Sequence, residues 1–422
     1  MVRASWAAAA LVAVGHVLQA QSSPPVAAPT QTPIRQNPSQ VIRRSFNLVS
    51  TDVVVRDAAG RFIPDLKKQD FEVYEDGVKQ EIVSFIVTVG GHIYNEVLPP
   101  MTPGMEGIIL PAAKPPRDVT GRVFVIFIDD LHLDFSHTGQ VRALFRQISK
   151  ELIHEGDMFA IVSTGTSSIA INPTYDRKQL AAAEKKIAGS SLAPNEILSA
   201  PLGANGLAEV NYRAHVAFAT ANDMLQQLEQ MHNRRKALIY LSNGYDLNPF
   251  RETREKNDKE RSAAIARGND DSANADHNAD PFGKQGNRFS EADLAAQLGE
   301  VIRAANRANA SIYTIDSRGL VGMPNLSQNI NMVEWQNYLT TSQNTLRTLA
   351  EGTGGFAIVN QNDYTKGLRR IDAETSDYYM VGYYSSNPDP LKRRRTIEVK
   401  VARKDATAEW RKEYSLKPLP RD

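Results

Sequence analysis

The sequence contains no cysteine among its 422 residues. This absence excludes disulfide bonds, thiolate metal sites, a cysteine nucleophile and a lipid-modified cysteine near the N-terminus. The chain also has no large excess of either charge, because it contains 49 Lys and Arg residues and 48 Asp and Glu residues, for a net charge of +1. A nearly neutral chain has no overall field that favours nucleic acid or an anionic membrane. We therefore expect no nucleic-acid partner.

Long apolar runs are also scarce, and the one that resembles a targeting segment lies at the N-terminus. Arg3 supplies a positive start, residues 7–18 are mostly apolar, and Ala20 offers a small residue for cleavage. This run is shorter than the roughly 20 apolar residues of a membrane span. The pattern predicts a signal peptide over 1–20 and a secreted or periplasmic protein without a membrane span. An uncleaved anchor is the alternative.

The next segments change composition in a way that indicates domain boundaries. Residues 21–44 are rich in Pro, Ser, Thr and Gln without periodicity, which predicts a disordered tether. Alternating apolar residues from Val49 to Val55 and the hairpin dipeptide Asp76-Gly77 predict an N-terminal β unit over 45–89. A linker rich in Pro and Gly is expected over 90–120.

Strand patterns alternate with helix patterns from 121 to 376. The run Arg122–Ile128 is almost wholly apolar, as in a strand buried on both faces, and 138–153 is amphipathic with a helical period. Such alternation predicts a Rossmann-like α/β domain with a mainly parallel sheet and helices on both faces. Residues 251–287 are polar and interrupt this rhythm. They predict a mobile insertion, with a partner-binding flap as the less favoured interpretation.

The β pattern returns over 377–416. Two or three strands bury too little surface to be stable alone. We therefore expect these strands to pack with the N-terminal β unit as a β-sandwich-like unit, into which the α/β domain is inserted. Tyrosines 378, 379, 383 and 384 are either a stacking platform for a sugar or base or, as we favour, packing residues on both faces of a strand.

Five short segments stand out in their order along the chain. They are Phe71–Gly77, Ile126–Leu133, Ile312–Gly319, Leu349–Gly355 and Tyr379–Tyr384. Together they resemble the von Willebrand factor A-related proteins found widely in Acidobacteria and their relatives. The resemblance implies an A-type domain, with a mainly parallel sheet and a ligand face at the strand tips. Function in that group is mostly unassigned, and a fold transfers architecture better than activity.

A-type domains often bind a divalent cation through an Asp-x-Ser-x-Ser loop, a distant Thr and a second Asp. Asp129 matches the first aspartate, but Leu131 and Leu133 stand at the serine positions, and Asn243 stands at the second aspartate. No residue matches the Thr clearly, although Ser190, Ser191 and Ser199 are candidates. The resemblance thus implies a degenerate site. Its remaining candidate ligands for Mg²⁺ or Ca²⁺ are Asp129, Asp130 and Asp246.

A substitute metal site is a second interpretation of the same loop. Carboxylate and imidazole groups gather there and suit a transition metal better than magnesium; they are Asp130, His132, Asp134 and His137, with Asp246 from the neighbouring strand tip. The structural interpretation is that Leu131 and Leu133 tuck under the loop while Asp134 or Ser136 caps the next helix. We favour the structural interpretation and expect no cofactor.

Polar residues at the strand tips are the candidate partner-binding face, since open α/β sheets bind ligands at this edge. These residues are Asp129, Asp130, Asp134, Asn243, Asp246 and Asp316. The sequence therefore predicts a non-enzymatic interaction module, for adhesion or scaffolding, that binds a protein partner in the cell envelope or outside. One alternative is a metal-dependent hydrolase that uses the Asp/His cluster over 129–137, with Asp130, His132 and Asp134 around the ion. Another is a purely structural envelope component.

Overall fold

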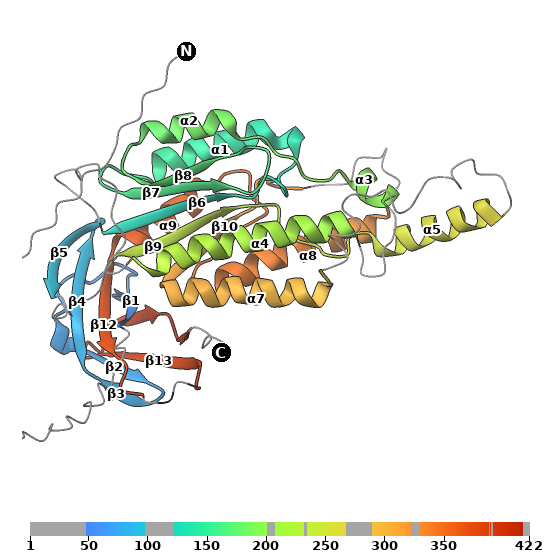
Figure 1. Cartoon of the computed structure of the whole chain (residues 1–422). Helices are drawn as coiled ribbons and strands as arrows, with labels where there is room; N and C mark the ends of the chain where they lie inside the picture. The colour runs from blue at the N-terminus through green and yellow to red at the C-terminus, as the bar shows by residue number, and fades with distance from the viewer. Residues whose placement is uncertain are drawn as a thin grey trace, which may run out of the picture. The chain divides into compact units, whose positions relative to one another are not determined.

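The computed structural model describes residues 48–97, 121–200, 207–231, 234–266, 289–321, 330–387, 389 and 391–416 (Figure 1). The predicted signal peptide and tether, and most of the predicted linker, lie outside the described residues. The described strands form three sheets, one of six strands, one of five and one of four. The chain is thus an α/β protein with a mixed, largely parallel sheet and two antiparallel sheets, as the sequence pattern predicted at this coarser level.

The six-stranded sheet has the order β11-β10-β9-β6-β7-β8. Its strands are β6 (Arg122–Ile128), β7 (Met158–Ser163), β8 (Ala170–Thr174), β9 (Arg235–Leu241), β10 (Ala310–Ile315) and β11 (Ala357–Ile358). All neighbours are parallel except β8, which is antiparallel to β7 at one edge. Every residue of β6 is buried, because this strand lies in the middle of the sheet with helices on both faces.

Alternate residues of β6 divide the core into two layers, as the two-residue period of a strand requires. Phe124, Ile126 and Ile128 pack on the side of α1 (Thr138–Glu151), α2 (Lys178–Lys186) and α9 (Thr365–Ser376). Val123, Val125 and Phe127 pack on the side of α4 (Ala208–Glu229), α7 (Glu291–Ala308) and part of α8 (Met332–Glu351). The sequence analysis named no helix at the position of α9.

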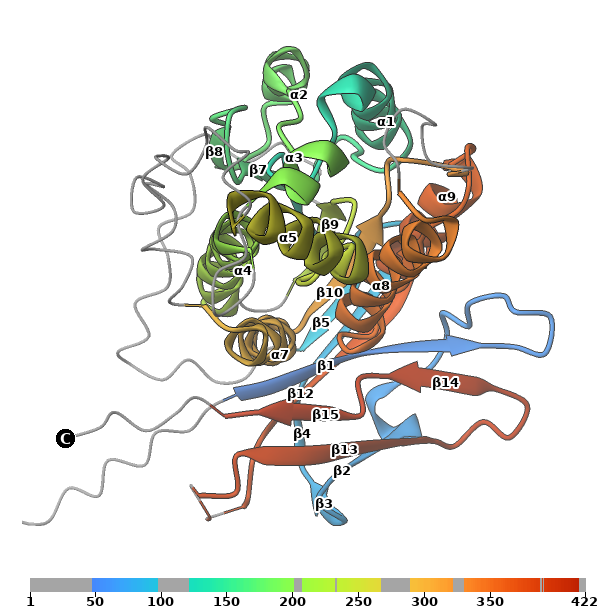
Figure 2. The ribbon, with the colours of Figure 1, turned by 90° about the vertical axis from the view of Figure 1, so that its right-hand side faces the viewer.

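A third, smaller apolar cluster gathers near the carboxyl ends of the strands. It joins α3 (Pro194–Ser199), the chain around Phe250 and the first turns of α8, where Trp335 and Tyr338 lie. These elements are on the right of Figure 1, and α3 and α5 face the viewer in Figure 2.

The segment predicted as a mobile insertion begins with a helix, α5 (Arg251–Ala266). The sequence analysis named no helix at this position, and 267–287 lies outside the described residues. The physical reason is a cap that sequence cannot show: the Glu334 carboxylate accepts hydrogen bonds from the backbone N–H groups of Glu252 and Thr253, at 2.9 and 3.1 Å. A capped first turn lets a strongly polar sequence begin a helix.

The two antiparallel sheets are built from both ends of the chain. Their orders are β14-β1-β12-β4-β5 and β15-β13-β2-β3. The strands are β1 (Leu48–Arg56), β2 (Phe71–Glu75), β3 (Val78–Gln80), β4 (Ile82–Val89), β5 (His92–Val97), β12 (Tyr378–Tyr384), β13 (Arg394–Val401), β14 (Thr407–Trp410) and β15 (Glu413–Ser415). Strand β12 lies between β1 and β4, and β13 pairs with β2. One shared apolar core joins both sheets.

Two details of this β region differ from or refine the sequence analysis. Strand β5 lies in the segment assigned to the linker, because Gly90 and Gly91, with φ of 58° and 81°, turn the chain back onto β4. Tyr378, Tyr379 and Tyr383 are at most 1% exposed. Their burial agrees with the packing interpretation and leaves no stacking platform at these three positions. No helix in the described ranges is long and apolar enough to cross a membrane.

Candidate functional site

The strand tips bring together residues that are far apart in the sequence. Because β6 and β9 pair in parallel up to Ile128 and Leu241, the chain emerges from both at the same edge of the sheet. Asp129 follows β6 and Ser242 follows β9. Asp316 follows β10, which is the next strand of the sheet beside β9. This is the edge at which doubly wound sheets bind their ligands.

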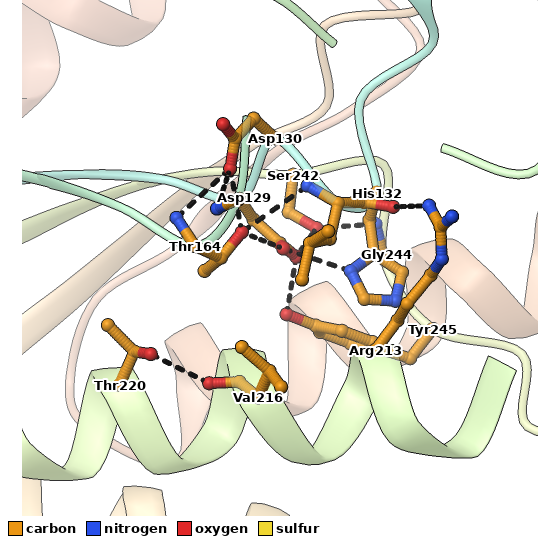
Figure 3. Close-up of polar contacts among 12 residues, drawn as sticks. Asp129, Asp130, His132, Thr164, Arg213, Val216, Thr220, Ser242, Gly244 and Tyr245 are labelled. Carbon is orange, nitrogen blue, oxygen red and sulfur yellow. Dashed lines mark hydrogen bonds and ion pairs between the residues drawn. The ribbon is translucent and has the colours of Figure 1, made fainter. Parts of the chain in front are cut away.

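The Asp129 side chain is completely buried and receives four hydrogen bonds (Figure 3). Oδ1 accepts from His132 Nδ1 at 2.9 Å and from the Thr164 hydroxyl at 3.1 Å. Oδ2 accepts from the hydroxyl groups of Ser242 at 2.7 Å and Tyr245 at 2.6 Å. Burial alone would raise the pKa of Asp129, but the charge of His132 and these hydrogen bonds hold it below its ordinary value. The carboxylate is thus a fully satisfied internal anion.

Tyr245 takes part in this network as a donor. Burial, together with the negative charge of Asp129, raises the pKa of Tyr245 well above its ordinary value, so the hydroxyl stays protonated. The preceding Gly244 has φ of 80°, and a Cβ there would lie 2.0 Å from the Ser342 carbonyl oxygen of α8. Only glycine allows this turn to pack so closely, and the turn carries Tyr245 back beneath Asp129.

Asp130 is buried as well and is bound to backbone. Its Oδ1 accepts from the N–H groups of Thr164 at 3.0 Å and Gly165 at 2.6 Å, and its Oδ2 accepts from the N–H of Ser167 at 2.6 Å. A carboxylate that satisfies three backbone donors of one loop fixes the conformation of the β7–β8 connection. Its role in this structure is to hold that loop.

The remaining predicted residues have local partners. Asp134 accepts from the N–H of Ser136 at 2.7 Å and caps the short 3₁₀ helix Phe135–His137, whereas the N-cap of the predicted helix α1 is His137, which makes no side-chain capping bond. Asp316 is buried against Arg318, with Nε to Oδ1 at 2.9 Å and Nη2 to Oδ2 at 2.9 Å. Arg318 Nη2 also donates to the backbone oxygen of Asn243 at 2.7 Å.

The sequence analysis expected these acids to form an accessible recognition face. For Asp129, Asp130 and Asp316 this expectation is wrong, because each is 0% exposed. Asn243 is only 6% exposed. For Asp129 and Asp130 the reason is that other loops bring N–H and O–H donors onto the carboxylates, and no local pattern in the sequence reveals those donors. Asp316 is instead covered by Arg318 of its own turn.

Thr164 is the site residue that the sequence analysis missed. Of the three candidate serines, Ser190 donates to the backbone oxygen of Asp130 at 3.1 Å, and Ser199 donates within its own helix. Thr164, by contrast, contacts the carboxylates of both Asp129 and Asp130, at 3.1 and 2.9 Å. Its position directly after β7, the strand beside β6, is the signal that identifies it.

A pocket of about 480 Å³, including the part open to solvent, lies beside this network. Apolar side chains form most of its wall, among them Leu131, Leu192, Ile197, Val210 and Tyr338. His132, Arg213 and Asp246 supply its charged and polar groups.

The charged groups of this pocket differ in how fully they are paired. Arg213 donates to Glu209, at 3.0 and 2.6 Å, and to the backbone oxygen of Ser190. Asp246 accepts a hydrogen bond from the N–H of Asn248 at 3.0 Å. Burial raises the pKa of Asp246 to about 6, although that hydrogen bond opposes the shift. The pocket therefore contains a desolvated carboxylate, a feature common at binding sites.

The predicted metal ligands do not fit a cation in this arrangement. Within the described ranges, no group of three or more His, Asp or Glu side chains is placed to hold a metal ion. Both oxygens of Asp129 and both of Asp130 already accept hydrogen bonds from protein donors. A cation would have to displace these donors, and Leu131 and Leu133 offer no side-chain oxygen in exchange.

Comparisons with known proteins add little beyond this geometry. No family model matches the chain, and no curated protein matches it. Among solved structures, the human COPII-coat protein Sec24c is similar, with 10% identity over 70% of this chain and a TM-score of 0.26. The match covers 43% of Sec24c, less than half of its length. So weak a likeness carries no argument about fold family or function.

Proposed function

We propose that this chain is an exported, non-enzymatic interaction module that binds a protein partner at the strand tips without a metal ion. Its α/β domain is of the von Willebrand A type. The sheet order, numbered by position in the chain, is that of a doubly wound sheet, 3-2-1-4-5-6, with an antiparallel edge strand. The five sequence segments that resemble the A-related proteins support the same assignment.

The pocket beside His132 and Asp246 is the observation that carries this proposal. It lies at the carboxyl edge of the sheet, and apolar walls with a few polar groups are typical of a binding site. Two exposed apolar side chains follow strands at the same edge: Phe135, 72% exposed, after β6, and Leu320, 66% exposed, after β10. We therefore assign partner binding to this pocket and these two side chains. The sequence analysis had assigned it to the acids, which are buried.

Metal independence follows from the hydrogen bonds of Asp129. A divalent ion needs free carboxylate oxygens, whereas Asp129 is held by four donors from its own chain. The same four donors hold the loops after β6, β7 and β9 together around Asp129, as a bound ion would do in a metal site. These hydrogen bonds support a binding site that needs no metal ion.

Capture of a partner from the native envelope tests the proposal. The variants are Asp246→Asn, which neutralises the pocket carboxylate, and Asp65→Asn, a control whose side chain is 70% exposed on the β region. We expect a chelator to leave capture unchanged, Asp246→Asn to weaken it about tenfold, and Asp65→Asn to have no effect. Loss of capture in the chelator arm, or equal capture by all three proteins, contradicts the proposal.

The hydrolase alternative has one specific contact in its favour. Asp129 orients the His132 ring through Nδ1, and that ring lines the pocket, as a general base would. However, the metal-dependent form of this alternative needs Asp130, whose oxygens are bound to the β7–β8 loop. Elemental analysis of the purified protein separates the two functions: a stoichiometric bound ion supports the hydrolase and opposes the module proposed above.

A further inference from the structure

A second pocket lies at the opposite edge of the parallel sheet, where β9 and β10 begin. Its volume is about 570 Å³, including the part open to solvent. Residues of the α/β domain, Arg235 and Ser311 among them, form one wall. Residues of the β region, Asp52 and Arg411 among them, form the other wall. This pocket is remote in the topology from the strand-tip site, so its function is a separate question.

Two guanidinium groups, Arg235 and Arg411, and three carboxylates, Asp52, Glu374 and Glu409, line this pocket. Arg235 and Asp52 are buried, whereas Glu409 is exposed. Asp52 is the buried carboxylate, and its oxygens already accept from Arg235 Nη1 and from Asn309 Nδ2, the latter at 3.0 Å. Glu374 also lines the pocket, but it accepts from Arg370 at 2.9 Å and from the Tyr313 hydroxyl at 3.3 Å. Asp52 is thus committed to Arg235, and the second guanidinium, Arg411, is left without an ion-pair partner among the described residues.

Three guanidinium nitrogens at this pocket lack a hydrogen-bond partner among the described residues. They are Nε of Arg235 and Nε and Nη1 of Arg411, and all three atoms are buried. Arg411 has one hydrogen bond, from Nη2 to the Ser50 backbone oxygen at 2.9 Å. A buried donor without a partner destabilises the folded state, so proteins rarely leave several of them together.

The electrostatic environment supports a missing anion. Burial lowers the pKa of Arg411 to about 10, against the opposing effect of the Asp52 charge. Burial also lowers the pKa of Lys236 to about 7, and the nearby positive charge of Arg411 contributes to that shift. Lys236 itself is satisfied by the backbone oxygens of Leu228 and Ala308. Arg411 is therefore the cationic group whose charge is not balanced by an ion pair among the described residues.

We propose that this pocket binds a small oxyanion, held by Arg411 and Arg235. A planar guanidinium donates paired, charge-assisted hydrogen bonds, which suit the spaced oxygens of a phosphate or a carboxylate group. Arg411 follows β14 in the β region, and Arg235 begins β9 in the α/β domain. An anion held by both joins the two parts of the molecule, so the bound form is more stable than the free form.

The test uses the full chain and inorganic phosphate, with acetate as the carboxylate arm, at constant ionic strength. We expect calorimetric titration to show one phosphate per chain and Tm to rise by about 2–4 °C at saturation. In Arg411→Gln we expect no rise and a loss of binding of about tenfold or more. The control Arg394→Gln removes a guanidinium that is 74% exposed on β13, and it should respond as the wild type does.

The outcomes are distinct even if Arg411→Gln fails to fold, because the titration of the wild type stands alone. Saturable binding of one anion supports the site, and the stronger of the two arms identifies the group as phosphate-like or carboxylate-like. No saturable binding of either anion overturns the proposal. A rise in Tm that is equal in the wild type and in both variants also overturns it, because phosphate then acts through the solvent.

Discussion

At the scale of single residues, the strand-tip acids stabilise loops. Asp129 collects four donors from three different loops, and Asp130 binds three backbone N–H groups of one loop. Donors that converge on a buried carboxylate become unsatisfied together if the carboxylate is removed. These acids are therefore poor probes of partner binding and good probes of stability.

Replacement of Asp129 should therefore reduce stability strongly. We expect Asp129→Ala to lower the free energy of unfolding by about 3–5 kcal/mol, since it removes the acceptor of four hydrogen bonds, two of them from the buried hydroxyl groups of Ser242 and Tyr245. The control Asp134→Ala removes a partly exposed cap and should cost about 1 kcal/mol. Urea denaturation measures both values.

The effect of Asp129 also has a definite pH dependence. Its pKa in the folded state lies below the ordinary value of 3.8, so its stabilising contribution is complete above that value and is lost as the pH falls through the folded pKa. The difference between wild type and Asp129→Ala should therefore be largest at neutral pH and shrink in acid. Equal stability of the two proteins at neutral pH would show that the hydrogen bonds of Asp129 contribute little.

At the scale of elements, helix α5 depends on a residue from another helix. Glu334, at the start of α8, accepts from two N–H groups of the first turn of α5 and also from the Thr253 hydroxyl. Because the first four N–H groups of a helix have no partner within it, an acceptor from outside decides where the helix begins. This contact ties α5 to the apolar cluster around Phe250 and Trp335.

Glu334→Ala should loosen α5 without unfolding the sheet. We expect faster amide exchange in the first turns of α5 and a loss of about 1–2 kcal/mol in stability, because the helix loses its N-terminal acceptor. Glu255→Ala is the matched control, since the side chain of this α5 residue is 45% exposed and pairs with Arg251 along the same helix. Unchanged exchange in Glu334→Ala would mean that other contacts hold the helix.

At the scale of the whole molecule, the β region is shared between the two ends of the sequence. Strand β12 separates β1 from β4, with antiparallel pairing on both sides, and β13 completes the other sheet beside β2. The N-terminal strands without β12 and β13 would expose their apolar faces and unpaired edges. The α/β domain thus lies in the sequence between strands that pair in the same two sheets.

A chain that ends at Asp377 tests this dependence. We expect β1, β2 and β4 to lose amide protection, because their pairing partners and half of their shared core are removed. A chain that ends at Leu416 retains all described strands and serves as the control. Persistent protection of β1 and β4 in the shorter chain would show that the N-terminal strands fold independently.

The elements themselves were largely predictable from the sequence. The apolar run Arg122–Ile128 predicted β6, and the amphipathic stripe over 138–153 predicted α1 within two residues at its C-terminus. Helix α9 and strand β5 were missed; β5 depends on the turn at Gly90 and Gly91, which brings the chain back onto β4. Composition alone also concealed α5, whose cap comes from a residue some 80 positions away.

What the sequence determined by itself is the α/β class, the positions of the acids at strand ends and the absence of side-chain oxygens at Leu131 and Leu133. These features are local, since they depend on periodicity and on residue type at a known position. Only the tertiary structure decided that Asp129 is sealed by Thr164, Ser242 and Tyr245, and that Arg235 and Arg411 share a pocket. Burial and pairing depend on which distant segments come into contact, and that is a property of the packed chain.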